Sequence, residues 1–232
     1  MVGAHTGGFN IDSFGTSLLG TYTTVVPPAA MLRSLEQLFA WKLGSSYRDP
    51  TATGTLTSAG GGYGPYPAGT LHTFAVVSGH RDAGYTSCPG DATYARMGSI
   101  RAAVSTFLGT AFVNPTISAT RVAFGSTTPV RVTATSLNAP AWNLDITTSL
   151  GTPVRSWTGA ATTPIAVTWD VTDAAGGPVP AGSYTVTLRG TSPDGDTALP
   201  WVTTVVIDTP QVPKGAWMSP GRFSTRFSAP TP

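Results

Sequence analysis

Residues 176–190 read GGPVPAGSYTVTLRG, and this stretch specifies the fold of the C-terminal half of the chain. Apolar Tyr184, Val186 and Leu188 alternate with polar residues, which is the period-two pattern of a strand with one buried face. The glycines and prolines before them are typical of a turn that leads into such a strand. We therefore predict a strand here that packs one of its faces on a core.

Six more β-branched runs with turn residues between them lie in the surrounding sequence. They are TISATRVA, PVRVTAT, WNLDITT, PVRSW, PIAVTWD and WVTTVVI. About seven short strands without a helical pattern predict an all-β immunoglobulin-like sandwich over residues 114–208. Four tryptophans of this region are Trp142, Trp157, Trp169 and Trp201. Core packing is the favoured interpretation for them, and stacking on sugars is the alternative.

Residues 1–113 have a different character, because they contain the helical patterns of the chain. Apolar side chains recur at helical spacing over residues 29–43, after Pro28, and again over residues 91–108. Between them, LHTFAVVS at residues 71–78 is apolar on both faces near its end, which predicts a buried strand. This order of helix, strand and helix favours a mixed α/β domain.

Composition excludes several classes of protein. The 232 residues include 13 Lys and Arg against 11 Asp and Glu, so a basic nucleic-acid-binding face is not expected. No apolar run reaches the roughly 18 residues that span a bilayer, and a single cysteine cannot form an intrachain disulfide. Residues 209–232 are rich in Pro and Ser, and we expect a flexible tail. Met1 to Ala4 lack the features of a signal peptide, which suggests an N-terminal truncation.

The best chemical evidence is the sequence SGHRDAGYTSCPG at residues 78–90. His80 and Cys88 carry side chains that bind zinc well. Gly84 lets the loop fold back, so these two side chains are able to converge on one ion. The alternative is that His80 is an ordinary loop histidine and Cys88 a small buried residue.

This loop, together with GAHTGGFNIDSFGTSLLGTY at residues 3–22, resembles the peptidoglycan recognition protein and type 2 N-acetylmuramoyl-L-alanine amidase family. The resemblance covers residues 3–108. It implies an α/β mixed-sheet amidase-like fold, with a strand at residues 10–20, and a secreted protein associated with the cell wall. The stretch at residues 176–190 resembles the Ig-like domain of flagellar hook-capping proteins.

The resemblance also implies roles for individual residues. His80 and Cys88 match zinc ligands, and Thr86 matches a catalytic position that orients or polarises the scissile amide. His5, Thr6 and Asn10 resemble groove residues that contact the muramyl peptide; turn formation is the alternative for these three.

The third zinc ligand of the family, an earlier histidine, is not visible in this sequence. His5 matches a different position of the family. His72 begins the strand that leads toward His80, and eight strand residues span about 26 Å. These two histidines therefore do not replace the third ligand.

The implied function is zinc-dependent hydrolysis of the amide between N-acetylmuramic acid and L-alanine in bacterial peptidoglycan. Two alternatives stay open: a non-catalytic peptidoglycan-binding module, and a cysteine-dependent cell-wall hydrolase that uses Cys88 as its nucleophile.

Two short motifs do not support other functions. His80-Arg81-Asp82 matches the HRD of protein kinases, but no phosphate loop, strand lysine or DFG accompanies it; Arg81 and Asp82 are expected to form a salt bridge or loop hydrogen bonds. The glycine-rich segment at residues 60–64 does not match G-x-G-x-x-G, and we interpret it as a loop.

Overall fold

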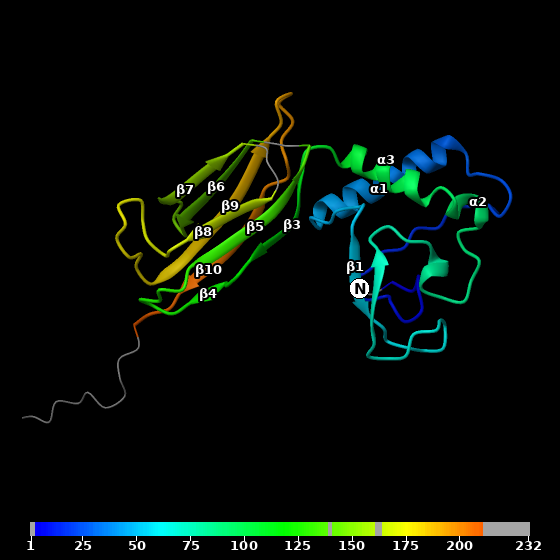
Figure 1. The fold of residues 1–232 in the computed structure, drawn as a ribbon, viewed down its shortest axis with the longest axis horizontal. Helices are drawn as coiled ribbons and strands as arrows, with labels where there is room; N and C mark the ends of the chain where they lie inside the picture. The colour runs from blue at the N-terminus through cyan, green and yellow to red at the C-terminus, as the bar shows by residue number, and fades with distance from the viewer. Residues whose placement is uncertain (1–2, 139–140, 161–163, 211–232) are drawn as a thin grey trace, which may run out of the picture.

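The computed structural model describes residues 3–138, 141–160 and 164–210, and these form two lobes (Figure 1). The predicted tail at residues 209–232 lies almost entirely outside the described residues. The last helix of the first lobe ends at Leu108, and the first strand of the second begins at Ala111. The proposed domain limits, 1–113 and 114–208, stay a prediction. No helix in the described part of the chain is long and apolar enough to cross a membrane.

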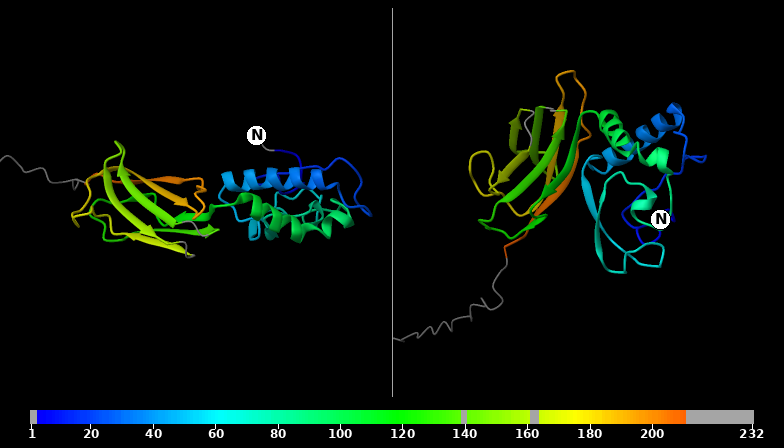
Figure 2. Two further views of the ribbon diagram at one scale, coloured as in Figure 1. Left: turned by 90° about the horizontal axis from the view of Figure 1, so that it is seen from above. Right: turned by 45° about the vertical axis from the view of Figure 1, so that its right-hand side comes forward.

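Two helices lie side by side in the first lobe (Figure 2). Helix α1 runs from Ala29 to Ser45, with Pro28 at its N-cap position. Leu35 and Ala40 of α1 pack in a small core with Val77 and with the helix at residues 97–108. The predicted apolar stripe on residues 29–43 faces this core, since Leu32, Phe39 and Leu43 also pack against it.

The second predicted helix is broken. Residues 91–94 form α2, Asp91–Tyr94, and a longer helix α3 restarts at Met97 and ends at Leu108. The backbone tightens at the break, because Arg96 N–H donates to the Thr93 carbonyl oxygen three residues back. Met97, Ile100 and Val104 of α3 are buried against α1.

The first lobe does not show the predicted mixed sheet. Among its described residues the sheet is a two-stranded antiparallel hairpin of β1, Thr53–Thr57, and β2, Leu71–Ala75. The prediction that residues 71–78 form a buried strand was wrong in part, because the strand ends at Ala75 and its residues Leu71 and Thr73 are exposed.

Residues 10–20, expected to form a strand, have turns and irregular backbone instead. Side chains take the place of a strand partner here. Asn10 Oδ1 accepts two backbone N–H groups, and Ser13 Oγ donates to the Phe9 carbonyl oxygen. Such local bonds compete with strand pairing.

The second lobe is a sandwich of two sheets, as predicted. One sheet has the order β4-β10-β9-β6-β7 and the other β3-β5-β8. Their bounds are β3 Ala111–Ile117, β4 Arg121–Val122, β5 Val130–Leu137, β6 Ala141–Thr148, β7 Pro153–Gly159, β8 Ile165–Trp169, β9 Gly182–Thr191 and β10 Trp201–Ile207. Neighbouring strands pair antiparallel except β4 and β10, which pair parallel.

The predicted buried face of β9 is confirmed, because Tyr184, Val186 and Leu188 are all buried in the sandwich core. Trp169 is 1% exposed, and its Nε1–H donates to the Thr172 carbonyl oxygen at 2.8 Å. The other three tryptophans of this lobe are partly buried and pack against the same core. Core packing is therefore the correct interpretation of these residues.

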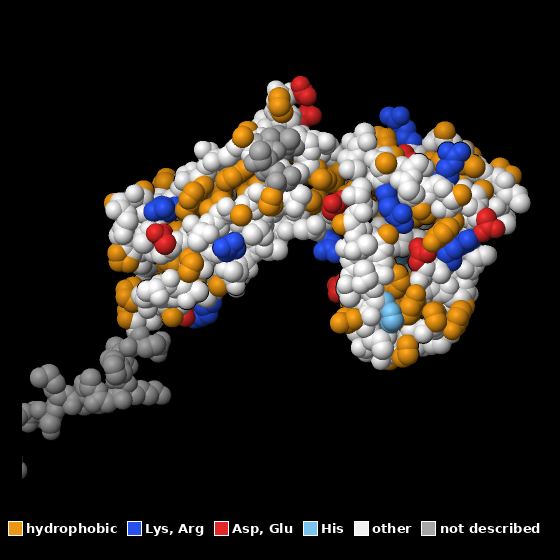
Figure 3. All heavy atoms as spheres, in the orientation of Figure 1, with side chains coloured by type: hydrophobic (Ala, Val, Ile, Leu, Met, Phe, Trp, Pro, Cys, Tyr) orange, Lys and Arg blue, Asp and Glu red, His pale blue; other side chains and the backbone are white. Residues whose placement is uncertain are grey.

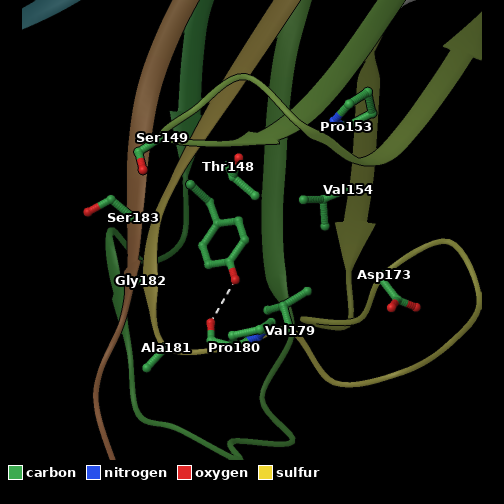
Figure 4. Close-up of a pocket in the computed structure, with 11 residues that line it drawn as sticks. Thr148, Ser149, Pro153, Val154, Asp173, Val179, Pro180, Ala181, Gly182 and Ser183 are labelled. Atoms are coloured by element: carbon green, nitrogen blue, oxygen red, sulfur yellow. Dashed lines mark hydrogen bonds between the residues drawn. The ribbon is translucent and has the colours of Figure 1, made fainter.

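An open pocket of about 280 Å³ lies at one end of the sandwich, lined by residues that include Thr148, Val154 and Asp173 (Figure 4). At its base the Tyr184 hydroxyl donates to the Pro180 carbonyl oxygen at 2.7 Å, which ties the turn at residues 176–182 to β9. The pocket is built entirely from sandwich residues, and it shares none with the loop at residues 78–90.

Candidate functional site

The loop that carries His80 and Cys88 is closed by its own backbone. Residues 80–82 form a short 3-10 helix, η1, His80–Asp82, and Arg81 N–H donates to the Cys88 carbonyl oxygen at 3.0 Å. Gly84 N–H donates to the His80 carbonyl oxygen at 3.0 Å, which continues the turn of η1, while convergence of the His80 and Cys88 side chains stays a prediction. His80 and Cys88 are exposed and stand at the two ends of the closed loop.

Arg81 holds the closed loop from the side. Its Nη1 lies 2.7 Å from Asp91 Oδ1, and its Nη2 donates to the Ser87 carbonyl oxygen. The guanidinium carbon lies 4.7 Å from the centre of the Tyr94 ring, in cation–π geometry. Arg81 therefore forms its salt bridge with Asp91 rather than with the neighbouring Asp82.

Asp82 also forms hydrogen bonds that hold this turn. Its Oδ2 accepts Gly79 N–H at 2.8 Å, and its Oδ1 accepts the Tyr94 hydroxyl. This hydrogen bond to a carboxylate raises the pKa of Tyr94, and the charge of Asp82 adds to the effect. Arg81 and Asp82 thus act as loop-holding residues, as the sequence suggested.

Thr86 lies two residues before Cys88, and its hydroxyl belongs to the loop. Its Oγ1 accepts the Cys88 N–H at 3.2 Å. This bond fixes the backbone at Cys88, and it is the pattern of a threonine that stabilises a turn. A role for Thr86 toward a scissile amide stays a prediction.

His5, Thr6 and Asn10 form one turn. Asn10 Oδ1 accepts the N–H groups of His5 at 2.9 Å and of Thr6 at 2.8 Å. His5 Nε2 lies 2.8 Å from Ser13 Oγ. The turn-forming interpretation therefore describes Asn10 well. His5 and Thr6 belong to the same turn through their backbone N–H groups. Contact with a muramyl peptide stays a prediction for all three.

His72 is held in an aromatic cluster. Its ring lies 4.1 Å from the Tyr66 ring between centroids, it also meets Phe9, and Nε2 lies 2.7 Å from Thr70 Oγ1. The structure therefore gives His72 a packing role.

In the part of the chain that the structure describes, the donors near His80 and Cys88 do not complete a zinc site. A catalytic zinc needs three protein ligands, and the described residues contain no group of three or more His, Cys, Asp or Glu side chains placed to hold a metal ion. His80 and Cys88 have the right chemistry for two of the three positions. A third donor has to join them before a catalytic site exists.

A glycine-rich segment, residues 58–69, contacts both parts of the candidate site, and its residues 60–64 were expected from the sequence to be only a loop. Ala59 N–H donates to the Gly8 carbonyl oxygen at 2.7 Å, and the Tyr66 hydroxyl donates to the Asp82 carbonyl oxygen at 2.9 Å. The sequence signal that was available is the aromatic spacing in GYGPY, which repeats a tyrosine after three residues.

Both halves of the chain have similarity to known proteins, and the two similarities differ in extent. The FlgD Ig-like domain family matches residues 118–194. Over these residues the sandwich is therefore similar to the FlgD Ig-like domain. This confirms the predicted resemblance to hook-capping proteins. A human N-acetylmuramoyl-L-alanine amidase is 36% identical over 93 residues, which is 40% of this chain and 12% of that protein.

Solved structures similar to the sandwich belong to several proteins. FlgD from Xanthomonas campestris is 23% identical with a TM-score of 0.30, over 41% of this chain and 67% of that one. The fibronectin(III)-like modules of Clostridium thermocellum CbhA are 12% identical with a TM-score of 0.29, over 42% of this chain and 96% of that one. The Ig-like assignment of the sandwich rests on the family match to residues 118–194 and on its two-sheet topology, whereas an amidase fold is not shown for the first lobe.

Proposed function

We propose that this protein binds bacterial peptidoglycan through residues 3–108, with the Ig-like sandwich as a spacer that carries no chemistry of its own. The observation that carries this proposal is the 36% identity with an N-acetylmuramoyl-L-alanine amidase over 93 residues. The substrate of such an enzyme is the muramyl peptide of the cell wall. A protein that binds this peptide would therefore act outside the cytoplasm, in association with the cell wall.

The geometry of the first lobe supports a binding role. The turn at residues 5–10 and the loop at residues 79–90 are each fixed by internal hydrogen bonds, and residues 58–69 contact both. A surface that is ordered before the ligand arrives loses less entropy on binding. Because Oδ1 of Asn10 is used by the turn, its amide nitrogen is the group left for a ligand.

The test is co-sedimentation of the full chain with purified, insoluble peptidoglycan. We expect most of the protein in the pellet, and we expect a soluble muramyl peptide to release it. Cellulose serves as the matched insoluble control. Protein that stays in the supernatant with peptidoglycan, as it does with cellulose, would refute the proposal.

Hydrolysis is the second candidate, and the closed loop between His80 and Cys88 favours it. These two residues would hold a zinc ion, which when bound polarises an amide carbonyl and lowers the pKa of its water to about 7. Thr86 would then orient the scissile amide between N-acetylmuramic acid and L-alanine. The third donor is the element that this candidate still requires.

Hydrolysis is tested by release of free L-alanine amino groups from peptidoglycan with zinc added. A chelator and Cys88→Ala should both abolish the release if zinc is used. A cysteine-dependent hydrolase would instead survive the chelator and lose activity in Cys88→Ala. Release that survives both treatments rejects both chemistries.

A further inference from the structure

We propose that Tyr63 and Tyr85 form a sugar-stacking site for the glycan strand of peptidoglycan. This inference rests on the proposed function and names the part of the polymer that the first lobe holds. Tyr63 comes from the glycine-rich segment, residues 58–69, and Tyr85 from the closed loop, residues 79–90. Both side chains are among the exposed large hydrophobic groups of the lobe.

Tyr63 lies directly against the turn that carries His5, Thr6 and Asn10. A Cβ atom placed on Gly7 would stand 2.4 Å from Tyr63 Cγ, so only glycine leaves room for the ring. Gly61 is also close, since a Cβ there would stand 2.9 Å from Tyr63 Cε2. The glycines on both sides of this contact therefore set the place of the ring.

Tyr85 is joined to Tyr63 through the backbone. Tyr85 N–H donates to the Tyr63 carbonyl oxygen at 2.8 Å. The two chain segments approach closely next to this bond, because a Cβ on Gly64 would stand only 2.5 Å from the Ala83 carbonyl oxygen. The two tyrosines thus project from neighbouring backbone positions. Tyr63 lies against the turn of His5, and Tyr85 lies in the loop that carries His80 and Cys88.

Exposure separates these tyrosines from the packed aromatic residues nearby. Tyr63 is 66% exposed and Tyr85 is 73% exposed. Tyr66 and Phe9 instead pack edge-to-face at 5.4 Å. Aromatic rings placed in water on an ordered backbone give a ligand a large contact area at small entropic cost, because tyrosine has only two side-chain torsions.

The chemistry of the segment favours a sugar over a charged group. Residues 58–69, SAGGGYGPYPAG, contain no charged side chain. Arg81, the cation of the adjoining loop, is already bound to Asp91 and to the Ser87 carbonyl oxygen. A pyranose offers an apolar C–H face to an aromatic ring and hydroxyl groups to the phenol, so it fits this neutral surface better than the carboxylates of a stem peptide.

Figure 3 shows that hydrophobic side chains and a histidine share one region of the first lobe's surface, whereas Lys and Arg gather mainly toward its helices. This distribution agrees with a weakly charged surface on the part of the lobe away from its helices.

The experiment measures binding of the full chain to a peptide-free oligomer of N-acetylglucosamine and, separately, to free stem peptide, by titration calorimetry. We expect the oligomer to bind and Tyr85→Ala to weaken it about three- to tenfold, the range of aromatic stacking. Tyr85→Phe keeps the ring and should bind like the native chain. Trp41→Ala removes an aromatic ring that is 66% exposed on α1, outside this surface, and should change nothing.

Tyr63→Ala is a second variant for the same binding measurement. Tyr85→Ala is the variant that should fold normally, because the Tyr85 ring lies largely in water. Native affinity for the oligomer in Tyr85→Ala and Tyr63→Ala would overturn the stacking site. Binding of the stem peptide without the oligomer would also overturn it, while leaving the proposed function intact. A native chain that binds neither probe and does not sediment with peptidoglycan would refute the proposed function itself.

Discussion

The guanidinium group of Arg81 lies 2.7 Å from the carboxylate of Asp91, across the base of the loop that ends at Cys88. The same group donates to the Ser87 carbonyl oxygen and stacks on Tyr94. One side chain therefore joins the start of the loop, its end and the helix that follows. An exposed ion pair alone is worth only about 0–1 kcal/mol. The hydrogen bond to Ser87 and the contact with Tyr94 therefore add to what Arg81 contributes to the order of this loop.

Arg81→Met should loosen the loop at residues 83–90 without unfolding the lobe. Loss of the hydrogen bonds and ion pair removes about 1 kcal/mol of local stability, which is roughly a fivefold gain in local opening. Amide hydrogen exchange of a peptide spanning this loop measures the effect. Arg131→Met, which removes an exposed arginine from β5, is the matched control; equal exchange in the two variants would contradict the role given to Arg81.

Asn10 should control the turn at residues 5–10 through one oxygen atom. Asn10→Ala leaves the N–H groups of His5 and Thr6 without their acceptor, at a cost of about 1–2 kcal/mol. We expect weaker co-sedimentation with peptidoglycan and faster exchange at these two amides.

Asn10→Asp separates the turn from the side-chain amide. It keeps the accepting oxygen and should preserve the slow exchange of His5 and Thr6. If Asn10→Ala and Asn10→Asp exchange at the same rate, then the oxygen does not hold the turn.

Local patterns in the sequence predicted much of this structure. The alternation on β9 and the stripe on α1 both report a single buried face, and both faces are buried as expected. The strand at residues 10–20, which the family resemblance implied, is not formed because Asn10 and Ser13 satisfy backbone groups locally.

The candidate site was predicted less completely, because its remaining contacts join segments far apart in the sequence. The closure at Arg81 and Cys88 lies within one loop, and the sequence indicated through Gly84 only that this loop is able to fold back. Tyr63 and Gly7 are far apart in the sequence but lie in contact. Why position 7 has to be a glycine is seen only in the structure, because a Cβ there would collide with the Tyr63 ring.

Trp169 should be the tryptophan on which the stability of the sandwich depends most. Trp169→Ala removes a side chain that is 1% exposed and should cost about 3–5 kcal/mol, a large share of a domain's stability of 5–15 kcal/mol. Thermal unfolding followed by circular dichroism should show a midpoint lower by at least about 10 °C. Trp41→Ala, at an exposed position, should shift the midpoint by a degree or two at most, and a comparable shift in both variants would reject a core role for Trp169.

Tyr47 joins the two lobes, and its ionisation should weaken this junction at high pH. Its hydroxyl donates to the Pro200 carbonyl oxygen at 2.7 Å, while its own carbonyl oxygen accepts Asn114 N–H at 2.7 Å. Burial raises the pKa of the Tyr47 phenol, so the folded chain holds this proton more tightly than the unfolded chain does. The resulting stability is complete below about pH 10 and is lost as the pH rises through the higher pKa of the folded state.

Tyr47→Phe tests this junction because it removes the donor and the ionisable group but keeps the ring. We expect a loss of about 1 kcal/mol at neutral pH, the usual value of one hydrogen bond. Urea unfolding at pH 7 and at pH 10.5 measures both effects, and the fall in stability between these pH values should be smaller in the variant than in the native chain. Tyr22→Phe, at a hydroxyl bonded within the first lobe to the Leu19 carbonyl oxygen, is the matched control. An unchanged pH dependence in Tyr47→Phe would show that the phenol at the junction does not contribute, since every other tyrosine is still present in that variant.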